Sequence, residues 1–274
     1  MLQYPTPPLW KHFSQLPSNR DKNIMEVRRL FLIEQAKYEN EMIMYNFLKQ
    51  LGSSTTTTTQ VVAESNILYG LLYNWYAVND AGGIAPDGWR IPTDDDWTDL
   101  TNELGAGAGG AMKTTGTLDD GTGLWNAPNT GATNSSGFSG LPGGRRNYFN
   151  GNYDFLGNYG HWWSATESSA TNAWLRRLDY VNANVLRLNY DKKMGFSVRC
   201  VRDTQPPSAN VTDKTGNVYT WVKIGNQYWL AQNLATTKYN NGNPIPTGLD
   251  NGAWSSTTDG AYAYPNNDSN LVYI

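Results

Sequence analysis

The longest amphipathic pattern in the chain lies near its N-terminus. Residues 23–51, NIMEVRRLFLIEQAKYENEMIMYNFLKQL, contain no Pro or Gly and predict one long helix. Its apolar positions fall in two seams, which is more apolar surface than a helix on a monomer needs. We interpret the helix as buried in an oligomer or a docking site, the alternative being a helix packed on its own domain. The residues expected to anchor it, one of them from the preceding Pro-rich segment, are Trp10, Val27, Leu30, Phe31, Ile33, Met44, Phe47 and Leu51.

A second, shorter helix is predicted over IPTDDDWTDLTNELG, residues 91–105. Thr93 is the expected N-cap, and the acidic residues 94–96 fill the first turn, where carboxylates interact favourably with the helix dipole. Helix capping explains this acidic triplet better than calcium binding, because a calcium site needs oxygen ligands from several turns of chain. The apolar stripe of this helix is Trp97, Leu100 and Leu104.

Alternating side-chain character predicts three strands between residues 172 and 201, with the sequences NAWLRRLDY, VLRLNY and FSVRCV. Turns at VNAN and DKKMG are expected to join them in succession as a meander. Successive side chains of a strand lie on opposite faces. One face of the first strand carries Trp174, Arg176, Leu178 and Tyr180, and the other carries Leu175, Arg177 and Asp179. On the second strand, one face carries Leu186, Leu188 and Tyr190, and the other carries Val185, Arg187 and Asn189.

Changes in sequence character divide the chain into three parts. Residues 1–52 combine a Pro-rich peg with the long helix, and residues 53–65 form a Thr-rich linker. Residues 66–274 contain short strands, turns and many tryptophans. Within this part, residues 111–144 predict a long loop region that needs its own aromatic residues, Trp125 and Phe138, to hold it in place.

Composition excludes several classes of protein. Charged residues make up 16% and aromatics 13% of the chain, the opposite of the balance in disordered proteins. A net charge of -3 gives no electrostatic case for nucleic-acid binding. No apolar window is long enough to span a membrane, and no basic segment followed by an apolar run begins the chain. We therefore expect neither membrane insertion nor a secretory signal.

The residues that usually carry catalysis are sparse. The two histidines, His12 and His161, lie far apart in the sequence, and Cys200 is the single cysteine. No nucleophile–base pattern, metal-ligand spacing or phosphate-binding fingerprint can be assembled from them. We therefore expect no enzymatic activity, no metal and no cofactor.

Five segments carry a resemblance to a known family: YGLLYNWYAV, GWRIPTDDDW, WNAPNTGATNSSGFSGLPGGRRN, WWSATE and GFSVRCVRD, which fall between residues 69 and 203. They resemble the FISUMP family, the Fibrobacter succinogenes major paralogous domains, which have a C-type-lectin-like fold. The resemblance resumes at TDKTGNVYTWVKIGNQYWLAQNLATTKYNNGNPIP, residues 212–246, and at DNGAWSSTTDGAYAYPNND, residues 250–268. It implies an α+β fold.

The order of these segments differs from that of the family, in which the segment that resembles GNVYTWVKIGNQYWLAQNL opens the domain and the one that resembles GFSVRCVRD closes it. A circular permutation of one domain over residues 66–274 is the simplest interpretation, with the TQPPSANVTDKTG segment joining the former ends. The alternatives are a segment swapped between subunits, a truncated second copy, or an independent domain. Permutation predicts that residues 196–201 and 218–224 pair in one sheet.

A lectin-like fold implies ligand binding by a face of loops and strands. Residues 147–163, NYFNGNYDFLGNYGHWW, interleave aromatic residues with Asn and Gly, as antibody paratopes do. We expect Trp162, Trp163 and Trp174 to lie in the core. Variable lectin-like proteins diversify their last strands, and that resemblance adds six strand residues. The expected ligand-binding set is Tyr153, Phe155, Tyr159, Leu175, Arg177, Asp179, Leu186, Leu188 and Tyr190. The triplet APN at 127–129 lacks the residue that calcium-dependent lectins place before proline, so no calcium is expected.

The layout of anchor, linker and head favours a phage structural protein, a head or tail fibre or appendage. We expect it to be made in the host cytoplasm and to reside in the virion as a homo-oligomer, a trimer being one option. Residues 1–51 would contact other virion proteins, and the head would bind a host-surface glycan or protein. Two alternatives stay open: a bacterial adhesin-like or glycan-binding surface protein, and an intracellular assembly module.

Overall fold

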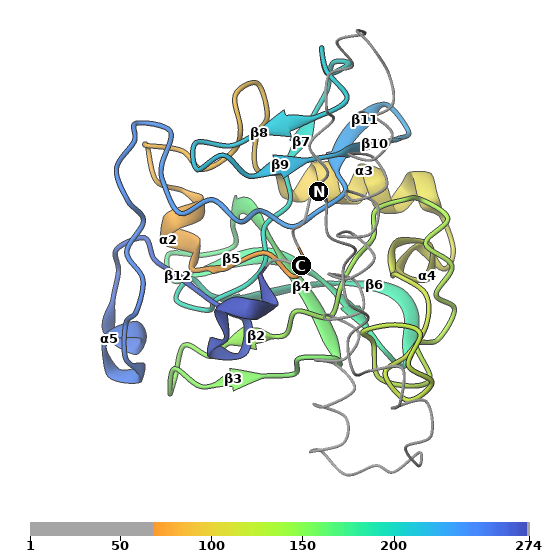
Figure 1. Ribbon diagram of the computed structural model, residues 1–274, viewed down its shortest axis with the longest axis horizontal. Helices are drawn as coiled ribbons and strands as arrows, with labels where there is room; N and C mark the ends of the chain where they lie inside the picture. The colour runs from red at the N-terminus through yellow and green to blue at the C-terminus, as the bar shows by residue number, and fades with distance from the viewer. Residues whose placement is uncertain (1–67, 273–274) are drawn as a thin grey trace, which may run out of the picture.

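The computed structural model describes residues 68–272, which form many short strands and a few helices (Figure 1). The predicted anchor residues, Trp10, Val27, Leu30, Phe31, Ile33, Met44, Phe47 and Leu51, and the linker, residues 53–65, lie outside the described part. The strands are β1 (Leu72–Tyr73), β2 (Arg145–Arg146), β3 (Tyr153–Asp154), β4 (Tyr159–Glu167), β5 (Asn172–Asp179), β6 (Asn182–Asp191), β7 (Val201–Arg202), β8 (Val211–Thr212), β9 (Val218–Tyr219), β10 (Trp221–Ile224), β11 (Gln227–Leu230) and β12 (Tyr262–Ala263). The helices are α2 (Trp75–Val78), α3 (Asp94–Leu104), α4 (Ala108–Met112), α5 (Asn251–Ser256) and the 3-10 turns η2 (Pro265–Asn267) and η3 (Ser269–Leu271). Small sheets with few helices agree with an α+β class.

The longest strands, β4, β5 and β6, form an antiparallel sheet in the middle of the molecule. Its register confirms the predicted alternation, because Leu175 lies opposite Leu188 and Arg176 lies opposite Arg187. Leu175 faces the larger hydrophobic core, while Leu178 faces a second core beside α3. Both faces of this sheet are therefore covered along part of their length, and neither is a continuous solvent surface.

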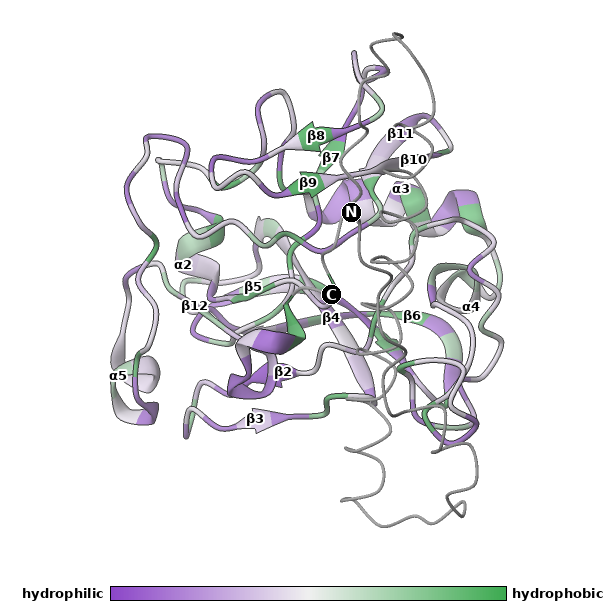
Figure 2. Cartoon of the chain, viewed as in Figure 1, coloured by the Kyte–Doolittle hydropathy of each residue, from purple (hydrophilic) through white to green (hydrophobic). Residues whose placement is uncertain are grey.

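Helix α3 begins and ends as predicted. The Thr93 side chain accepts from the Asp96 backbone, the Asp96 side chain accepts from the Thr93 backbone, and Gly105 follows the last turn. In Figure 2, α3 carries hydrophobic and hydrophilic positions side by side, as an amphipathic helix does. Asp94 does more than favour the dipole, because it accepts from Arg176 at 2.5 Å and pairs with Arg187 at 2.8 Å. These ion pairs hold α3 against β5 and β6.

The long loop region after α4 is held by buried side chains, as predicted. Trp125 and Phe138 are both fully buried. Lys113 is also buried, and its ammonium group donates to the carbonyl oxygens of Thr130, Asp179 and Asn182 at 2.8–3.0 Å. Burial lowers the pKa of Lys113 to about 8. A polar anchor of this kind, made to backbone carbonyls, leaves no side-chain partner that a sequence pattern could reveal.

The third predicted strand is wrong in position. FSVRCV does not continue the meander beside β6, since residues 191–194 turn the chain and Ser197 bridges Trp162 at the other edge of β4. Phe196, Val198 and Cys200 thereby enter the larger core, which an outer position beside β6 would not allow. Between residues 196 and 200 the backbone joins its neighbours through isolated bridges, and regular strand pairing begins with β7.

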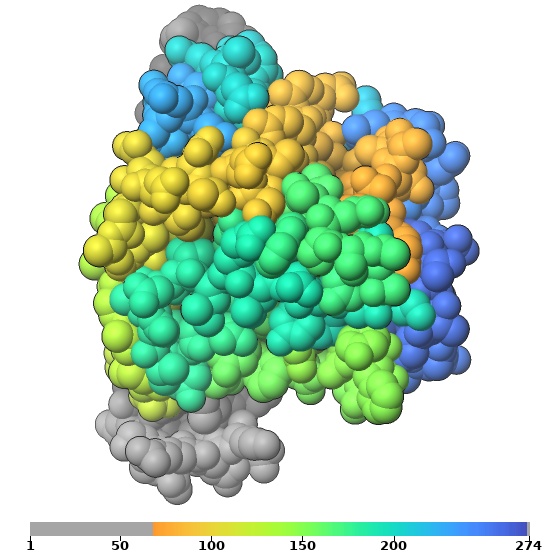
Figure 3. All heavy atoms as spheres, turned by 180° about the vertical axis from the view of Figure 1, so that it is seen from behind, coloured from red at the N-terminus to blue at the C-terminus, as the bar shows by residue number. Residues whose placement is uncertain are grey.

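The segments on either side of QPPS, residues 205–208, share one sheet, in the order β10-β11-β7. We expected residues 196–201 and 218–224 to pair with each other, and this is wrong, because β11 lies between β7 and β10 in the sheet that they share. The two ends of the described chain also meet. β1 pairs with β12, and the backbone N–H groups of Leu68 and Tyr69 donate to Val272 and Leu271 at 2.8 and 3.2 Å. Figure 3 shows the orange and blue ends side by side along one edge.

One buried amide connects these segments. The Oδ1 atom of Asn233 accepts from Trp162 Nε1 at 2.8 Å and from Arg199 Nε at 2.7 Å. Its Nδ2 atom donates to the carbonyl oxygen of Tyr69 at 2.8 Å. Arg199 is 1% exposed, and its remaining nitrogens donate to the carbonyl oxygens of Phe138, Leu230 and Ser139. Residues from both sides of QPPS thus complete one hydrogen-bond network.

Replacing Asn233 with leucine (Asn233→Leu) is predicted to destabilise the fold by about 3 kcal/mol, because the buried Trp162 and Arg199 N–H groups would lose their acceptor. Urea denaturation followed by tryptophan fluorescence would measure the change. Asn102→Ala is the matched control, since Asn102 is exposed on α3. Equal denaturation midpoints for the two variants would contradict the central role of Asn233.

Candidate functional site

The nine residues predicted to bind ligand do not form one surface. Leu175 is fully buried in the larger core, and Asp179 is 7% exposed, with its side chain accepting from the backbone of Val181. Leu188 and Tyr190 pack partly against the same core. The prediction is therefore wrong for Leu175 and Asp179. The sheet face chosen by analogy with variable lectin-like proteins is, over half its length, a core face that packs on Trp163 and Phe196.

Part of the predicted set does gather where the same sheet face leaves the core. Phe155 and Tyr159 lie with ring centroids 4.8 Å apart, and Phe155 is 41% exposed. The Arg177 guanidinium lies 4.5 Å from the centroid of Tyr159, and that of Arg145 lies 4.7 Å from the centroid of Phe155. Leu186 pairs with Arg177 on the neighbouring strand and is half-buried. Because arginine side chains of the protein already lie over the rings of Phe155 and Tyr159, the faces of these rings are less accessible to a ligand.

Of the tryptophans expected in the core, some are buried and one is not. Trp162 and Trp163 are fully buried, as predicted. Trp174 is only half-buried, and the Arg187 guanidinium lies 3.3 Å from its ring centroid. Sequence reasoning also missed two aromatic residues on the β2–β3 loop, Tyr148 at 37% and Phe149 at 78% exposure. Their signal was present in NYFNGN, where Asn147 and Asn150 accept from backbone N–H groups two residues later and so expose the loop.

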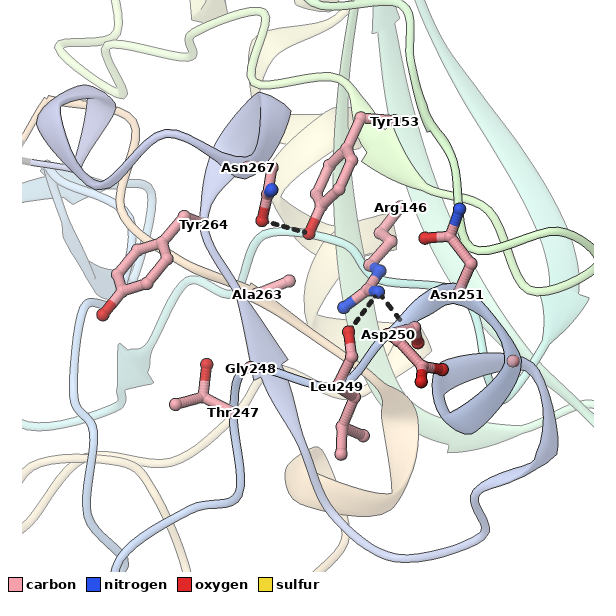
Figure 4. A pocket seen from close by; sticks show the side chains of 11 residues that line it. Arg146, Tyr153, Thr247, Gly248, Leu249, Asp250, Asn251, Ala263, Tyr264 and Asn267 are labelled. Atoms are coloured by element: carbon pink, nitrogen blue, oxygen red, sulfur yellow. Dashed lines mark hydrogen bonds between the residues drawn. The ribbon is translucent and has the colours of Figure 1, made fainter.

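Tyr153 lies elsewhere, in a pocket of about 650 Å³ that we call the Arg146 pocket (Figure 4). The hairpin of β2 and β3 forms one wall, and the loop before α5 and the β12–η2 segment form the others. The pocket is lined by Arg146, Tyr153, Thr247, Gly248, Leu249, Asp250, Asn251, Gly252, Ala263, Tyr264 and Asn267. Most of these residues come from the segment after QPPS, far in sequence from Tyr153, so sequence spacing could not assemble them.

Arg146 forms the base of this pocket and is 3% exposed. Its Nε donates to the Gly151 carbonyl at 3.1 Å, and its Nη2 donates to the Leu249 carbonyl at 2.6 Å and more weakly to that of Asp250. The guanidinium lies 4.3 Å from the ring centroid of Trp254. Burial lowers the pKa of Arg146, although Tyr153 and Asp250 oppose that effect.

The strand β2 sends neighbouring arginines in opposite directions. Arg145 reaches Phe155 and Asp154, whereas Arg146 reaches the pocket. In the pocket, the Tyr153 hydroxyl donates to Asn267 Oδ1 at 3.4 Å. Figure 4 shows the ring of Tyr153 beside Asn267 and Arg146, with Tyr264 across the β12–η2 segment and the Thr247 hydroxyl near the other end of the lining. Aromatic faces combined with hydroxyls, amides and one cation suit a polar ring-shaped ligand.

A second pocket, of about 620 Å³, lies beside α2 and has a different chemistry. Its lining includes the aromatic residues Tyr76 and Tyr239 and the carboxylates Asp80 and Asp259. Burial raises the pKa of Tyr239 to about 12, and the two carboxylates add to that effect. Because no lysine or arginine lines this pocket, it serves as a natural comparison for the Arg146 pocket.

Within the described residues, the histidine and the cysteine are enclosed by the fold. His161 is 1% exposed and stacks on Phe196, and burial lowers its pKa to about 3. Cys200 is fully buried, and burial raises the pKa of its thiol. Within residues 68–272 no group of three or more His, Cys, Asp or Glu side chains is placed to hold a metal ion. In the same range, no helix has the length and apolar character needed to cross a membrane.

Comparison with known proteins gives one match. The family model for the Fibrobacter succinogenes major domain matches residues 30–202, which confirms the resemblance found in the sequence. The match covers more than half of the chain and stops at the end of β7, before the segment that supplies most of the Arg146 pocket. No curated protein and no solved structure matches the chain.

Proposed function

The chain belongs to the Fibrobacter succinogenes major domain family, and on that premise we propose that it is a non-catalytic binding protein that displays a lectin-like domain on a phage virion. The observation that carries the binding role is the Arg146 pocket, which combines two tyrosine rings with amide, hydroxyl and guanidinium groups. Such a lining matches the ring faces and hydroxyl groups of a sugar, so a glycan is the proposed ligand.

We further propose that the domain is a circular permutation of the lectin-like fold, carried by residues 66–274. Three contacts support it: β1 pairs with β12, β7 pairs with β11, and residues 68 and 272 are hydrogen-bonded. These contacts are the ones that a permuted domain needs, because they join the segments before and after residues 205–208 and both ends of the described residues. Asn233 supports it as well, because its amide joins the segments before and after QPPS.

The phage setting rests on the layout of peg, long helix, Thr-rich linker and head. In this proposal, residues 1–51 bind other virion proteins and form a homo-oligomer, while the head faces outward. A bacterial adhesin-like surface protein is the second candidate, and it is favoured by the same pocket, because a glycan-binding head serves either setting.

Reversing the permutation is predicted to preserve the fold. The rearranged chain runs from residue 208 to 274, continues through a short Gly-Ser linker into residue 67 and ends at residue 204. Its free energy of unfolding should lie within about 2 kcal/mol of that of the natural order, because closing a short loop costs little. Thermal denaturation and circular dichroism would compare the two chains. A rearranged chain without cooperative unfolding would contradict the permutation, provided that the natural order of residues 66–274 unfolds cooperatively.

Purified phage particles are predicted to contain the chain at a fixed stoichiometry, because a fibre or appendage is a stoichiometric component. Quantitative mass spectrometry of gradient-purified virions would measure its ratio to the major capsid protein. Finding the chain only in the host-cell envelope would favour the adhesin-like candidate instead.

Glycan binding is predicted to depend on Tyr264. Tyr264→Leu should weaken binding to any glycan that the full chain captures about tenfold, because it removes a ring face while keeping apolar volume. Glycan-array screening followed by titration calorimetry would measure this. Tyr76→Leu, which makes the same change in the second pocket, is the control. If Tyr76→Leu were the variant that lost binding, the glycan site would be the second pocket and not this one.

A further inference from the structure

Buried cations in this domain follow a consistent pattern, with one exception. Arg176 pairs with Asp94, and Lys192 pairs with Glu167. Lys113 and Arg199 lack a carboxylate partner, but each of their donor nitrogens reaches an oxygen acceptor. A buried cation is tolerated in either arrangement, because its donors or its charge are compensated.

Arg146 fits neither arrangement. Its acceptors are neutral backbone carbonyls, and no ion pair with a carboxylate forms within the described residues. Its third nitrogen, Nη1, donates to none of the described residues. Figure 4 shows the Arg146 guanidinium beside Tyr153, with dashed lines from one nitrogen to Leu249 and Asp250, and the whole guanidinium lines the pocket. A guanidinium that is 3% exposed thus has an unused donor and no carboxylate in direct contact, although Asp250 lies close enough to offset part of the effect of burial on its pKa, and it lines a pocket.

We infer that the Arg146 pocket binds a sugar that carries a carboxylate, which accepts from Arg146 Nη1. This inference rests on the proposed glycan-binding function and specifies its ligand class. A carboxylate is favoured because charge-assisted hydrogen bonds to guanidinium are about twice as strong as neutral ones, and a buried site screens them little. Uronic acids and sialic-type sugars share this chemistry.

The other pocket residues decide where the ligand lies. Asp250 would repel a carboxylate, but Oδ1 of Asp250 accepts from Ala253 at the start of α5. Figure 4 places its carboxylate on the opposite side of Arg146 from Tyr264. The ligand carboxylate therefore lies on the Tyr264 side, where the Thr247 hydroxyl is a second donor. The sugar ring then extends between Tyr153 and Tyr264, with the amide of Asn267 beside its hydroxyl groups.

The test is titration calorimetry of the full chain with four ligands: a glucuronic-acid oligosaccharide, a galacturonic-acid oligosaccharide, a sialylated oligosaccharide, and a neutral glucose oligosaccharide of matched length. At least one acidic ligand is expected to bind about tenfold or more tightly than the neutral one, and the difference should largely persist between about 0.05 and 0.5 M NaCl, because a buried ion pair is screened little. The identity of the tightest acidic ligand distinguishes a uronic from a sialic source.

Two variants locate the carboxylate. Arg146→Gln should reduce acidic-ligand affinity to the neutral level, while Arg145→Gln, a matched change on the other face of β2, should leave it within about twofold of the natural chain. Thr247→Val provides a second reading if Arg146→Gln does not fold, with an expected loss of about threefold to tenfold for acidic ligands alone.

Each other outcome overturns a different statement. Equal affinity for acidic and neutral ligands overturns the inference that the ligand carries a carboxylate, but it leaves the proposal of glycan binding intact. A loss caused by Arg145→Gln and not by Arg146→Gln overturns the assignment of the carboxylate to this pocket. Binding of none of these ligands, together with an empty glycan array, overturns the proposed function itself.

Discussion

The described domain depends on the side-chain amide of Asn233. Trp162 and Arg199 are both buried and both need an acceptor, and one oxygen atom of Asn233 satisfies an N–H group of each. The other end of the amide donates to the backbone of Tyr69, at the beginning of the described chain. A hydrogen-bond donor without an acceptor costs more free energy in a protein interior than in water. Packing around this amide therefore requires the segments that contain Tyr69, Trp162 and Arg199 to be in place together with Asn233. The amide also joins two clusters of buried side chains, because Trp162 belongs to the core beside α3 and Tyr69 to a smaller cluster with Leu271.

Local rules of sequence predicted the parts of the fold whose causes are local. The N-cap at Thr93, the apolar stripe of α3 and the alternating faces of β5 and β6 follow from neighbouring residues, and the structure confirms them. Burial of Trp125 and Phe138 followed from the need to hold a long loop. Residues 196–200 were misplaced because alternation identifies a strand but not its neighbour, and only the larger core decides that this segment lies beside β4.

The candidate site was less predictable, for a related reason. Tyr153 was predicted as a ligand-binding residue and lines the Arg146 pocket, but most of its pocket partners lie about a hundred positions later in the chain. Analogy with variable lectin-like proteins selected Leu175 and Asp179, which tertiary packing buries. The dipeptide Arg145-Arg146 gave no indication of its two separate roles, because a strand of two residues places its side chains on opposite faces only once β3 is paired with it.

The meeting of residues 68 and 272 has a mechanical consequence. A head that is held through a tether before residue 68 receives any pulling force at Tyr69, whose carbonyl accepts from Asn233 and whose N–H donates to Leu271. The force is therefore shared among several hydrogen bonds, made to Asn233 and to residues 271 and 272, and is not carried by one contact alone. In the proposed role, an attachment of that kind would let the domain stay folded while it is pulled from its N-terminal side.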